Sequence, residues 1–314
     1  MTIKNVKFFL VNAFTSTAYG GNPAAVIFLD EPLPEDAYYK IAGNFNQPMA
    51  AFLLPAAGRV YEGEEKDDPF DLSTTKTFAM RWFTPTFEAP QCGHATLALA
   101  HELFQDRDLA PPTATLLRFE TMHCIFSARR LSPLSATPKI QVQLPAHSVT
   151  AVDEEEFQKM KNIVAKASGK QDIAIRFIGN VKGEIGFDVY VLVELDEQED
   201  LGGIKFDTSA FLETPYIVNI MTKAGQTPEI AYETRMFAPK IGVSEDHVCG
   251  SANCLLAPYW AQKLGKKDGE EMSAKQVSQR AGDLWTEVDM VNKKVLLSGE
   301  ATTFAKGEFT IEVV

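Results

Sequence analysis

The segment Arg81-Trp82-Phe83-Thr84-Pro85, followed at Cys92-Gly93-His94-Ala95 by a long apolar run, decides how this chain folds because it occurs twice. The second copy is Arg235-Met236-Phe237-Ala238-Pro239, followed at Cys249-Gly250-Ser251-Ala252 by another apolar run. Each copy reads as a strand, a loop and the start of a buried helix. The repetition predicts two similar halves that meet around one site, each contributing a helix N-terminus and a thiol.

The length and composition are those of a two-domain globular protein. A chain of 314 residues, 45% of them hydrophobic, fits two domains of ordinary size and can bury a core in each. Its 42 acidic and 30 basic residues give a formal net charge of −12, which repels nucleic acid and anionic membranes. We therefore expect no nucleic-acid partner and no membrane partner.

The N-terminal sequence and the cysteine spacing favour a cytoplasmic location. The apolar run from Phe8 to Val11 is too short for a secretion signal or a membrane span. The four cysteines have no paired C-x-x-C spacing, which argues against a disulfide framework and against a zinc ribbon. We expect no metal, and each thiol needs its own explanation.

The first half of the chain reads as short strands with two helices. Apolar periodicity and turn residues predict strands at 6–14, 23–29, 50–54, 78–83, 115–120, 124–129 and 140–144, and helices at 34–46 and 93–104. The second of these helices is apolar on nearly every face, which places it inside a domain. The acidic segment 56–76 reads as a solvated loop or as a surface for a basic partner.

The second half repeats this order of elements. We expect helices at 154–167 and 251–264 and strands at 173–178, 187–194, 216–222, 231–237, 284–288, 295–298 and 308–313. Pro258 should kink the second helix or end its first turns. The fold class is α+β, with an antiparallel sheet wrapped around a central helix in each half.

The candidate linker between the halves is the stretch from Ser132 to Pro138. We therefore predict an N-terminal domain of residues 1–135, joined by the C-terminal strand 303–314. Residues 136–302 form the second predicted domain.

The two Cys-Gly turns have the properties of a carboxylate receptor. A helix N-terminus presents N–H groups and a partial positive charge, so two of them bind a carboxylate without a cofactor. Gly93 and Gly250 allow the close backbone approach that this needs. The same field should lower the pKa of Cys92 and Cys249 toward neutrality, as a proton-transferring thiol requires. The alternative is that both cysteines are small buried residues that precede helices.

Four further side chains near the turns are candidates. His94 lies in the first turn of its helix, where a neutral imidazole can exchange a proton near pH 7 or simply pack. Asp246 and Glu88 each precede a Cys-Gly turn, where a carboxylate can work on a substrate or hydrogen-bond the loop. Ser251 offers a hydroxyl to the receptor, and no His/Asp partner order suggests that it is a hydrolase nucleophile.

Several motifs in one order resemble the PhzF-like (phenazine biosynthesis-like) isomerase family over nearly the whole chain. They are Gly21-Asn22-Pro23-Ala24-Ala25-Val26, Arg81-Trp82-Phe83-Thr84-Pro85 with Glu88, Cys92-Gly93-His94-Ala95-Thr96-Leu97-Ala98, Phe237-Ala238-Pro239, Glu245-Asp246, Gly250-Ser251-Ala252, Ala257-Pro258-Tyr259-Trp260, Ser278-Gln279-Arg280 and Leu296-Leu297-Ser298-Gly299. The resemblance implies the diaminopimelate-epimerase-like fold, with two pseudo-symmetric domains and an active site in the cleft. It also implies cofactor-free isomerase chemistry in a homodimer.

The same resemblance implies roles for residues at matching positions. His94 and Asp246 become acid/base or substrate-contacting residues, and Asn22 becomes a residue of the cleft. The anion-binding positions are Gly93, Gly250 and Ser251.

One position departs from the family's pattern. The family's catalytic glutamate stands in Asn-x-x-Glu-(Ser/Thr)-x-Phe, whereas this chain reads Asn46-Gln47-Pro48-Met49-Ala50-Ala51-Phe52. Methionine has no titratable proton, so Met49 cannot serve as the base. Related two-thiol racemases and epimerases use Cys-Gly turns in both halves, which makes Cys92 and Cys249 candidate substitutes, one taking and one giving a proton.

We therefore predict a cofactor-independent isomerase or epimerase that acts on a small carboxylate, with amino and hydroxy acids as the expected class. The catalytic candidates are Cys92, Cys249, His94 and Asp246, and the substrate-binding candidates are Asn22, Glu88, Gly93, Gly250 and Ser251. The alternative is an inactive member of the family that binds a small acid or a protein partner, and Met49 is the argument for it.

Overall fold

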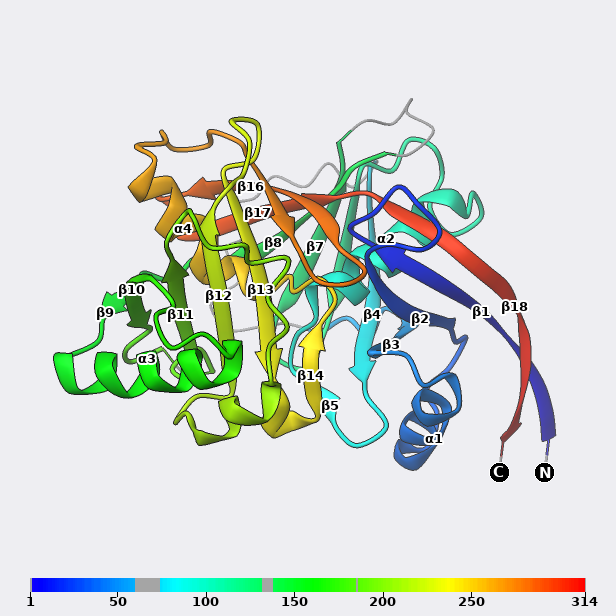
Figure 1. Cartoon of the computed structure of the whole chain (residues 1–314). Helices are drawn as coiled ribbons and strands as arrows, with labels where there is room; N and C mark the ends of the chain where they lie inside the picture. The colour runs from blue at the N-terminus through cyan, green and yellow to red at the C-terminus, as the bar shows by residue number, and fades with distance from the viewer. Residues whose placement is uncertain (1, 60–73, 132–137, 185, 314) are drawn as a thin grey trace. The chain divides into compact units, whose positions relative to one another are not determined.

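The computed structural model describes residues 2–59, 74–131, 138–184 and 186–313 (Figure 1). The chain forms two compact units, residues 1–143 with 298–314 (unit 1) and residues 144–297 (unit 2). The predicted boundaries lie after residues 135 and 302 and stay a prediction. Most of the predicted linker, 132–137, and most of the acidic segment, 60–73, lie outside the described residues.

Unit 1 is built on a mixed sheet. Its strands are β1 (Thr2–Ala13), β2 (Asn22–Phe28), β3 (Met49–Pro55), β4 (Thr75–Phe83), β5 (Glu88–Ala89), β6 (Leu116–Glu120), β7 (Ile125–Arg130), β8 (Ile140–Pro145) and β18 (Ala301–Val313). Hydrogen bonds join them in the order β18, β1, β2, β3, β4, β6, β7, β8. The pairs β2–β3 and β4–β6 are parallel and the others antiparallel, while β5 pairs with the end of β4. The paired ends of β1 and β18 bring the chain termini together (Figure 1).

Unit 2 repeats this topology. Its strands are β9 (Thr150–Ala151), β10 (Ile175–Asn180), β11 (Tyr190–Leu195), β12 (Val218–Ala224), β13 (Tyr232–Ala238), β14 (Val243–Asp246), β15 (Met272–Gln276), β16 (Gly282–Asp289) and β17 (Lys294–Gly299). From β10 to β16 the pairs alternate antiparallel and parallel as they do from β1 to β7. Strand β14 pairs with the end of β13, as β5 does with β4. The α+β fold class and the internal duplication are therefore confirmed, with parallel pairs that we did not predict.

One buried helix packs against the sheet in each unit. The helices are α1 (Glu35–Phe45), α2 (Gly93–Gln105), α3 (Glu154–Ser168) and α4 (Asn253–Lys263), with short 3₁₀ helices η1 (Thr208–Glu213) and η2 (Pro239–Ile241). Helix α2 is buried from Gly93 to Phe104 and contacts β1, β2, β3, β7 and β18, as its all-round apolar sequence predicts. In unit 2, Trp260 of α4 stacks on Tyr232 of β13 and donates a hydrogen bond to Thr222 of β12.

Side chains of β3 alternate between two helices. Ala50, Phe52 and Leu54 belong to the apolar cluster that includes Tyr38 of α1. Because successive residues of a strand point to opposite faces, the first residue of β3, Met49, faces the α2 side of the sheet.

Helix α4 continues through Pro258, so of the two predicted effects, a kink or an end of the first turns, the second is wrong. Proline has no N–H, which leaves the carbonyl of Cys254, one turn earlier, without its helical donor. The N–H of His147 donates to that carbonyl at 2.9 Å. A donor from outside the helix thus compensates for the missing hydrogen bond.

The sequence did not reveal the short strands β5, β9, β14 and β15. In β15 the buried positions are Met272, Ala274 and Gln276, a pattern that contains one strongly apolar residue. Alternation of this kind is not visible as hydrophobic periodicity. None of the helices in the described part of the chain has the length and apolarity needed to cross a membrane.

We expect Leu97→Ala to destabilise unit 1, because Leu97 is fully buried in α2 and the truncation leaves a cavity. The free energy of unfolding, measured by urea denaturation, should fall by about 2–5 kcal/mol. Ile3→Ala is the control in the same unit, since Ile3 is 71% exposed. Equal effects of the two substitutions would contradict the placement of α2 in the core.

Candidate functional site

The first Cys-Gly turn begins helix α2. Cys92 is the N-cap residue, and its Sγ lies 3.3 Å from Nδ1 of His94. Thr96 donates its N–H and its hydroxyl to the carbonyl of Cys92, at 3.1 and 2.7 Å. The N–H groups of Gly93, His94 and Ala95 therefore precede the first hydrogen bond within the helix. Cys92 and His94 are both buried.

The second turn has the same design in unit 2. Cys249 Sγ lies 3.4 Å from the hydroxyl of Ser251, and the Asn253 side chain donates to the Cys249 carbonyl at 3.0 Å. In both units, then, the second residue after the cysteine contacts its sulfur, and the fourth binds its carbonyl. The sequence repeat is a repeat of structure.

Helix α4 starts later than we predicted, at Asn253 instead of Ser251. Residues 250–252 form tight turns, in which Asn253 N–H bonds to Gly250 O and Cys254 N–H bonds to Ser251 O, both at 3.1 Å. The Ser251 hydroxyl also accepts a hydrogen bond from Tyr190 at 3.1 Å, a partner that no sequence motif indicated.

A bidentate ion pair supports the strand before each turn. Arg81 of β4 donates through Nε and Nη2 to the two oxygens of Glu88, both at 2.7 Å. Arg235 of β13 donates in the same way to Glu245, at 2.7 and 2.9 Å. The structure places Glu88 in this ion pair, and its predicted contact with a substrate stays a prediction.

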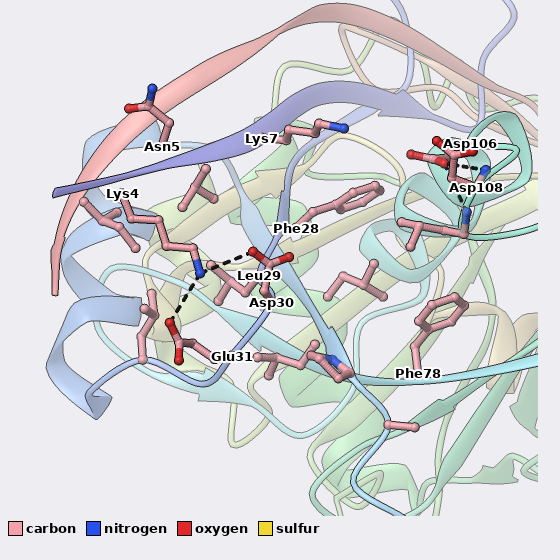
Figure 2. A pocket seen from close by; sticks show the side chains of 18 of the residues that line it. Lys4, Asn5, Lys7, Phe28, Leu29, Asp30, Glu31, Phe78, Asp106 and Asp108 are labelled. Atoms are coloured by element: carbon pink, nitrogen blue, oxygen red, sulfur yellow. Dashed lines mark hydrogen bonds and ion pairs between the residues drawn. The ribbon is translucent and has the colours of Figure 1, made fainter. Parts of the chain in front are cut away.

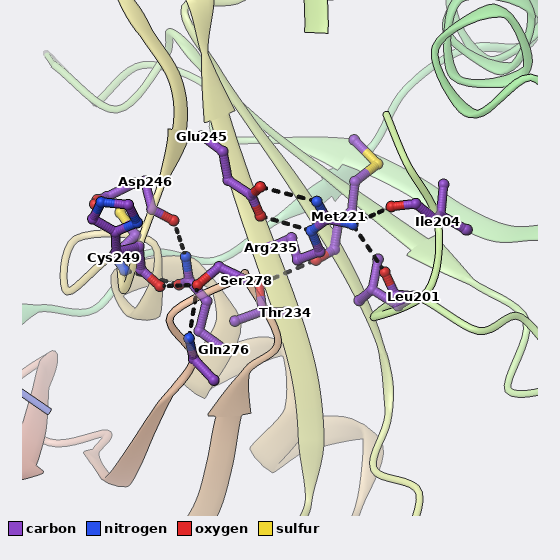
Figure 3. A network of polar contacts seen from close by, with 12 residues as sticks. Leu201, Ile204, Met221, Thr234, Arg235, Glu245, Asp246, Cys249, Gln276 and Ser278 are labelled. Carbon is purple, nitrogen blue, oxygen red and sulfur yellow. Dashed lines mark hydrogen bonds and ion pairs between the residues drawn. The ribbon is translucent and has the colours of Figure 1, made fainter. Parts of the chain in front are cut away.

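The loop from Asp246 to Cys249 is bound by Gln276, which sequence reasoning missed (Figure 3). The Gln276 amide donates to the carbonyl of Asp246 at 2.6 Å and accepts the N–H of Cys249 at 2.8 Å. A glutamine in a weakly patterned strand gives no sequence signal of such a role. Asp246 itself ends β14 and is partly buried.

Asn22 and Met49 lie at the same end of unit 1 as the first turn. They are the first residues of the parallel neighbours β2 and β3, where Met49 pairs with Ala24. The start of β3 adjoins the end of β4, since Ala50 pairs with Phe83, and β5 and α2 follow from there. Met49, the residue that the sequence resemblance sets against a glutamate, is buried and only 8% exposed.

A pocket of about 640 Å³ lies at the other end of these strands (Figure 2). It is lined by the last residues of β2 and β3, and Lys4 at its rim pairs with Asp30 and Glu31 at 3.2 and 3.3 Å. Within unit 1 it is therefore separate from the Cys-Gly turn. Among the described side chains, no group of three or more His, Cys, Asp or Glu residues is placed to hold a metal ion.

Burial raises the pKa of Cys249 well above its ordinary value, and the negative charge of Asp246 adds to the rise. Hydrogen bonds from Ser251 and from the Ala252 N–H act in the opposite direction but are weaker causes. Our expectation that the helix start lowers this pKa is therefore wrong for Cys249. Loss of hydration outweighs the helix field, and the thiol is neutral near pH 7.

We expect Cys249 to react slowly with iodoacetamide at pH 7, because only the thiolate is nucleophilic and burial disfavours it. The measurement uses a Cys92→Ser, Cys124→Ser, Cys254→Ser background, in which Cys249 is the remaining thiol. Its alkylation rate should rise only at a pH higher than the pH at which an ordinary cysteine becomes reactive. The same protein in urea serves as the control. Equally fast alkylation of folded and unfolded protein at pH 7 would contradict the neutral thiol.

The chain is similar to known proteins in sequence and in structure. The family described as Phenazine biosynthesis-like protein matches residues 11–307. Phenazine biosynthesis-like domain-containing protein 2 of Mus musculus is 35% identical over 288 residues, which cover 88% of this chain and 89% of that protein. A Pseudomonas aeruginosa protein named as an uncharacterized isomerase is 30% identical over 306 residues, which cover 98% of this chain and 99% of that protein.

A solved structure agrees with these relatives. The crystal structure of a PhzF-family phenazine biosynthesis protein of Enterococcus faecalis has a TM-score of 0.76 and 28% identity. The match covers 98% of this chain and 99% of that one. Since the family match extends over nearly the whole chain and includes both Cys-Gly turns, this protein belongs to the phenazine biosynthesis-like (PhzF) family.

Proposed function

We propose that this protein is an isomerase or epimerase that moves a proton on a small carboxylic acid without a cofactor. The observation that carries the proposal is the Cys-Gly turn, built twice to one design at the start of a buried helix. Membership of a family that includes a relative named as an isomerase supports this reaction class. Amino and hydroxy acids are the substrates that we propose first.

The carboxylate would bind to backbone N–H groups of the turns. Gly93 stands at the positive end of α2, a helix of 13 residues, and Gly250 stands in the turn that leads into α4. The hydroxyl of Ser251 accepts from Tyr190, so its own proton is available for a carboxylate oxygen or for Cys249.

Proton transfer would use unlike groups as acid and base. A neutral Cys249 thiol can donate a proton but cannot remove one, so it suits the acid role. Asp246, or the imidazole of His94 beside the Cys92 thiol, suits the base role. The sequence predicted that one of the two thiols takes a proton and the other gives one. We retain only the second role and assign it to Cys249.

We expect wild-type protein to incorporate deuterium from solvent into at least one acid of a panel of small amino and hydroxy acids. His94→Gln and Asp246→Asn should each lower the rate by about 10²–10⁴-fold, the usual contribution of an acid or base. Cys124→Ser is the control, since this thiol lies outside both turns.

Two results would decide against parts of the proposal. No deuterium incorporation into any acid would contradict the enzyme. Full incorporation by the Cys92→Ser, Cys249→Ser double variant would contradict the role of the thiols and no other part of the proposal.

A second function is favoured by Met49, the buried apolar residue at the position of the family's glutamate. In this case the protein binds a small acid or a protein partner and catalyses nothing. The carboxylate receptor would be retained, because neither glycine depends on Met49.

The second function predicts acid binding by calorimetry without deuterium exchange. Met49→Glu should then gain exchange, because it introduces a titratable group, whereas Met49→Gln, of similar shape, should not. Exchange by the wild-type protein would eliminate this alternative. The homodimer implied by the family resemblance and the cytoplasmic location favoured by the sequence are also proposals. Light scattering tests the first.

A further inference from the structure

We propose that Gln276, the last residue of β15, and Ser278, two residues after it, position Asp246 and the second Cys-Gly turn for the reaction. They are positioning residues, since they act on the backbone of the loop that carries the candidate groups. The part of this inference that concerns the reaction rests on the proposed function. The part that concerns the loop stands on geometry alone.

Gln276 bridges the two ends of the loop with one planar group. Its amide nitrogen donates to the Asp246 carbonyl at 2.6 Å, and its amide oxygen accepts the Cys249 N–H at 2.8 Å. The side chain is fully buried, so no water competes for these bonds. The amide therefore fixes the distance between the backbone of Asp246 and that of Cys249 (Figure 3).

Ser278 binds the next carbonyl along the loop. Its hydroxyl donates to the carbonyl of His247 at 2.5 Å and accepts the N–H of Ala281 at 3.2 Å. Two consecutive carbonyls, those of Asp246 and His247, are thus held by side chains two residues apart. We call Gln276 and Ser278 the loop clamp.

The residue before Asp246 is held independently. Glu245 accepts two hydrogen bonds from Arg235, whose side chain is 9% exposed and whose guanidinium also donates to the carbonyls of Leu201 and Ile204. Figure 3 shows this ion pair and the loop clamp reaching the same segment. The backbone is therefore held to β13 at the residue before Asp246 and to β15 at the carbonyl of Asp246. These two attachments fix the position of the backbone from which the Asp246 carboxylate extends.

The duplicated fold does not itself require the loop clamp. In unit 2, Thr234 of β13 pairs with Gln276 of β15. In unit 1, β4 and β6 pair in the equivalent register, and the residue that corresponds to Gln276 is Thr121. The hydroxyl of Thr121 donates instead to the carbonyl of Cys124, within its own hairpin. The same architecture thus forms with another residue at this place, which favours a role of Gln276 specific to the loop with Asp246.

The test compares Gln276→Met with Thr222→Val. Methionine keeps the length of glutamine and removes both hydrogen bonds to the loop. Thr222 is a buried residue of the same unit whose hydroxyl bonds to Glu233 O and Trp260 Nε1, so valine removes two buried bonds elsewhere. Hydrogen–deuterium exchange mass spectrometry of residues 246–252 needs no substrate and reads the loop directly.

We expect faster amide exchange of 246–252 in Gln276→Met than in wild type or Thr222→Val. With an acid that the wild type turns over, kcat should fall by about 10²-fold, the cost of a misplaced group, while KM changes far less. Thr222→Val should keep kcat near that of the wild type. If Gln276→Met does not fold, Ser278→Ala replaces it in the test, because it removes a single hydroxyl. The same two quantities, amide exchange of 246–252 and kcat, are then measured.

Gln276→Glu gives a rescue that a general loss of stability would not produce. A buried glutamic acid has a raised pKa, and in its protonated form it can donate to Asp246 O and accept from Cys249 N–H as glutamine does. Relative to the wild type at each pH, its kcat should therefore recover as the pH falls and decline as the carboxylate forms.

Each outcome decides one proposal. Unchanged exchange of 246–252 in Gln276→Met overturns the loop clamp, whatever the activity. A loosened loop with wild-type kcat overturns its role in the reaction. A wild type that turns over no acid overturns the proposed function instead, and the loop clamp is then decided by the amide-exchange comparison.

Discussion

The arginine–glutamate ion pair beside each Cys-Gly turn is the interaction on which the rest of the candidate site depends. Arg81 with Glu88 and Arg235 with Glu245 connect a central strand to the short strand that leads into the turn. The second arginine is largely buried, and breaking such a pair costs about 3–5 kcal/mol because it leaves an uncompensated charge. Each ion pair thus fixes the position of the backbone a few residues before the Cys-Gly turn.

Burial then determines what the turns can do chemically. Cys249 stands before a helix start, yet loss of hydration and the nearby Asp246 raise its pKa. A neutral thiol can donate a proton but cannot remove one, so the proposed reaction needs another group as its base. Met49, which the sequence resemblance sets against a glutamate, has no titratable proton and cannot serve as the base either, so His94 and Asp246 are the candidates that our proposal retains.

Much of the fold was predictable because its signals are local. The all-apolar run after Cys92 indicated a buried helix, and the repeated Arg-x-Phe-x-Pro pattern indicated two similar units. Strand β15 and residue Gln276 were not predictable, since alternating Met272, Ala274 and Gln276 has little hydrophobic contrast. Continuation of α4 through Pro258 depends on His147, which is far away in sequence.

By itself, the sequence determined the duplication, the family and the order of most helices and strands, because these follow from motifs and periodicity along the chain. Only the tertiary structure decided that Glu88 is paired with Arg81, that Cys249 is neutral, and that Gln276 holds the loop of Asp246. Hydration and hydrogen-bond partners come from residues that are distant in the chain. They are therefore properties of the packed units and cannot be read from any single segment.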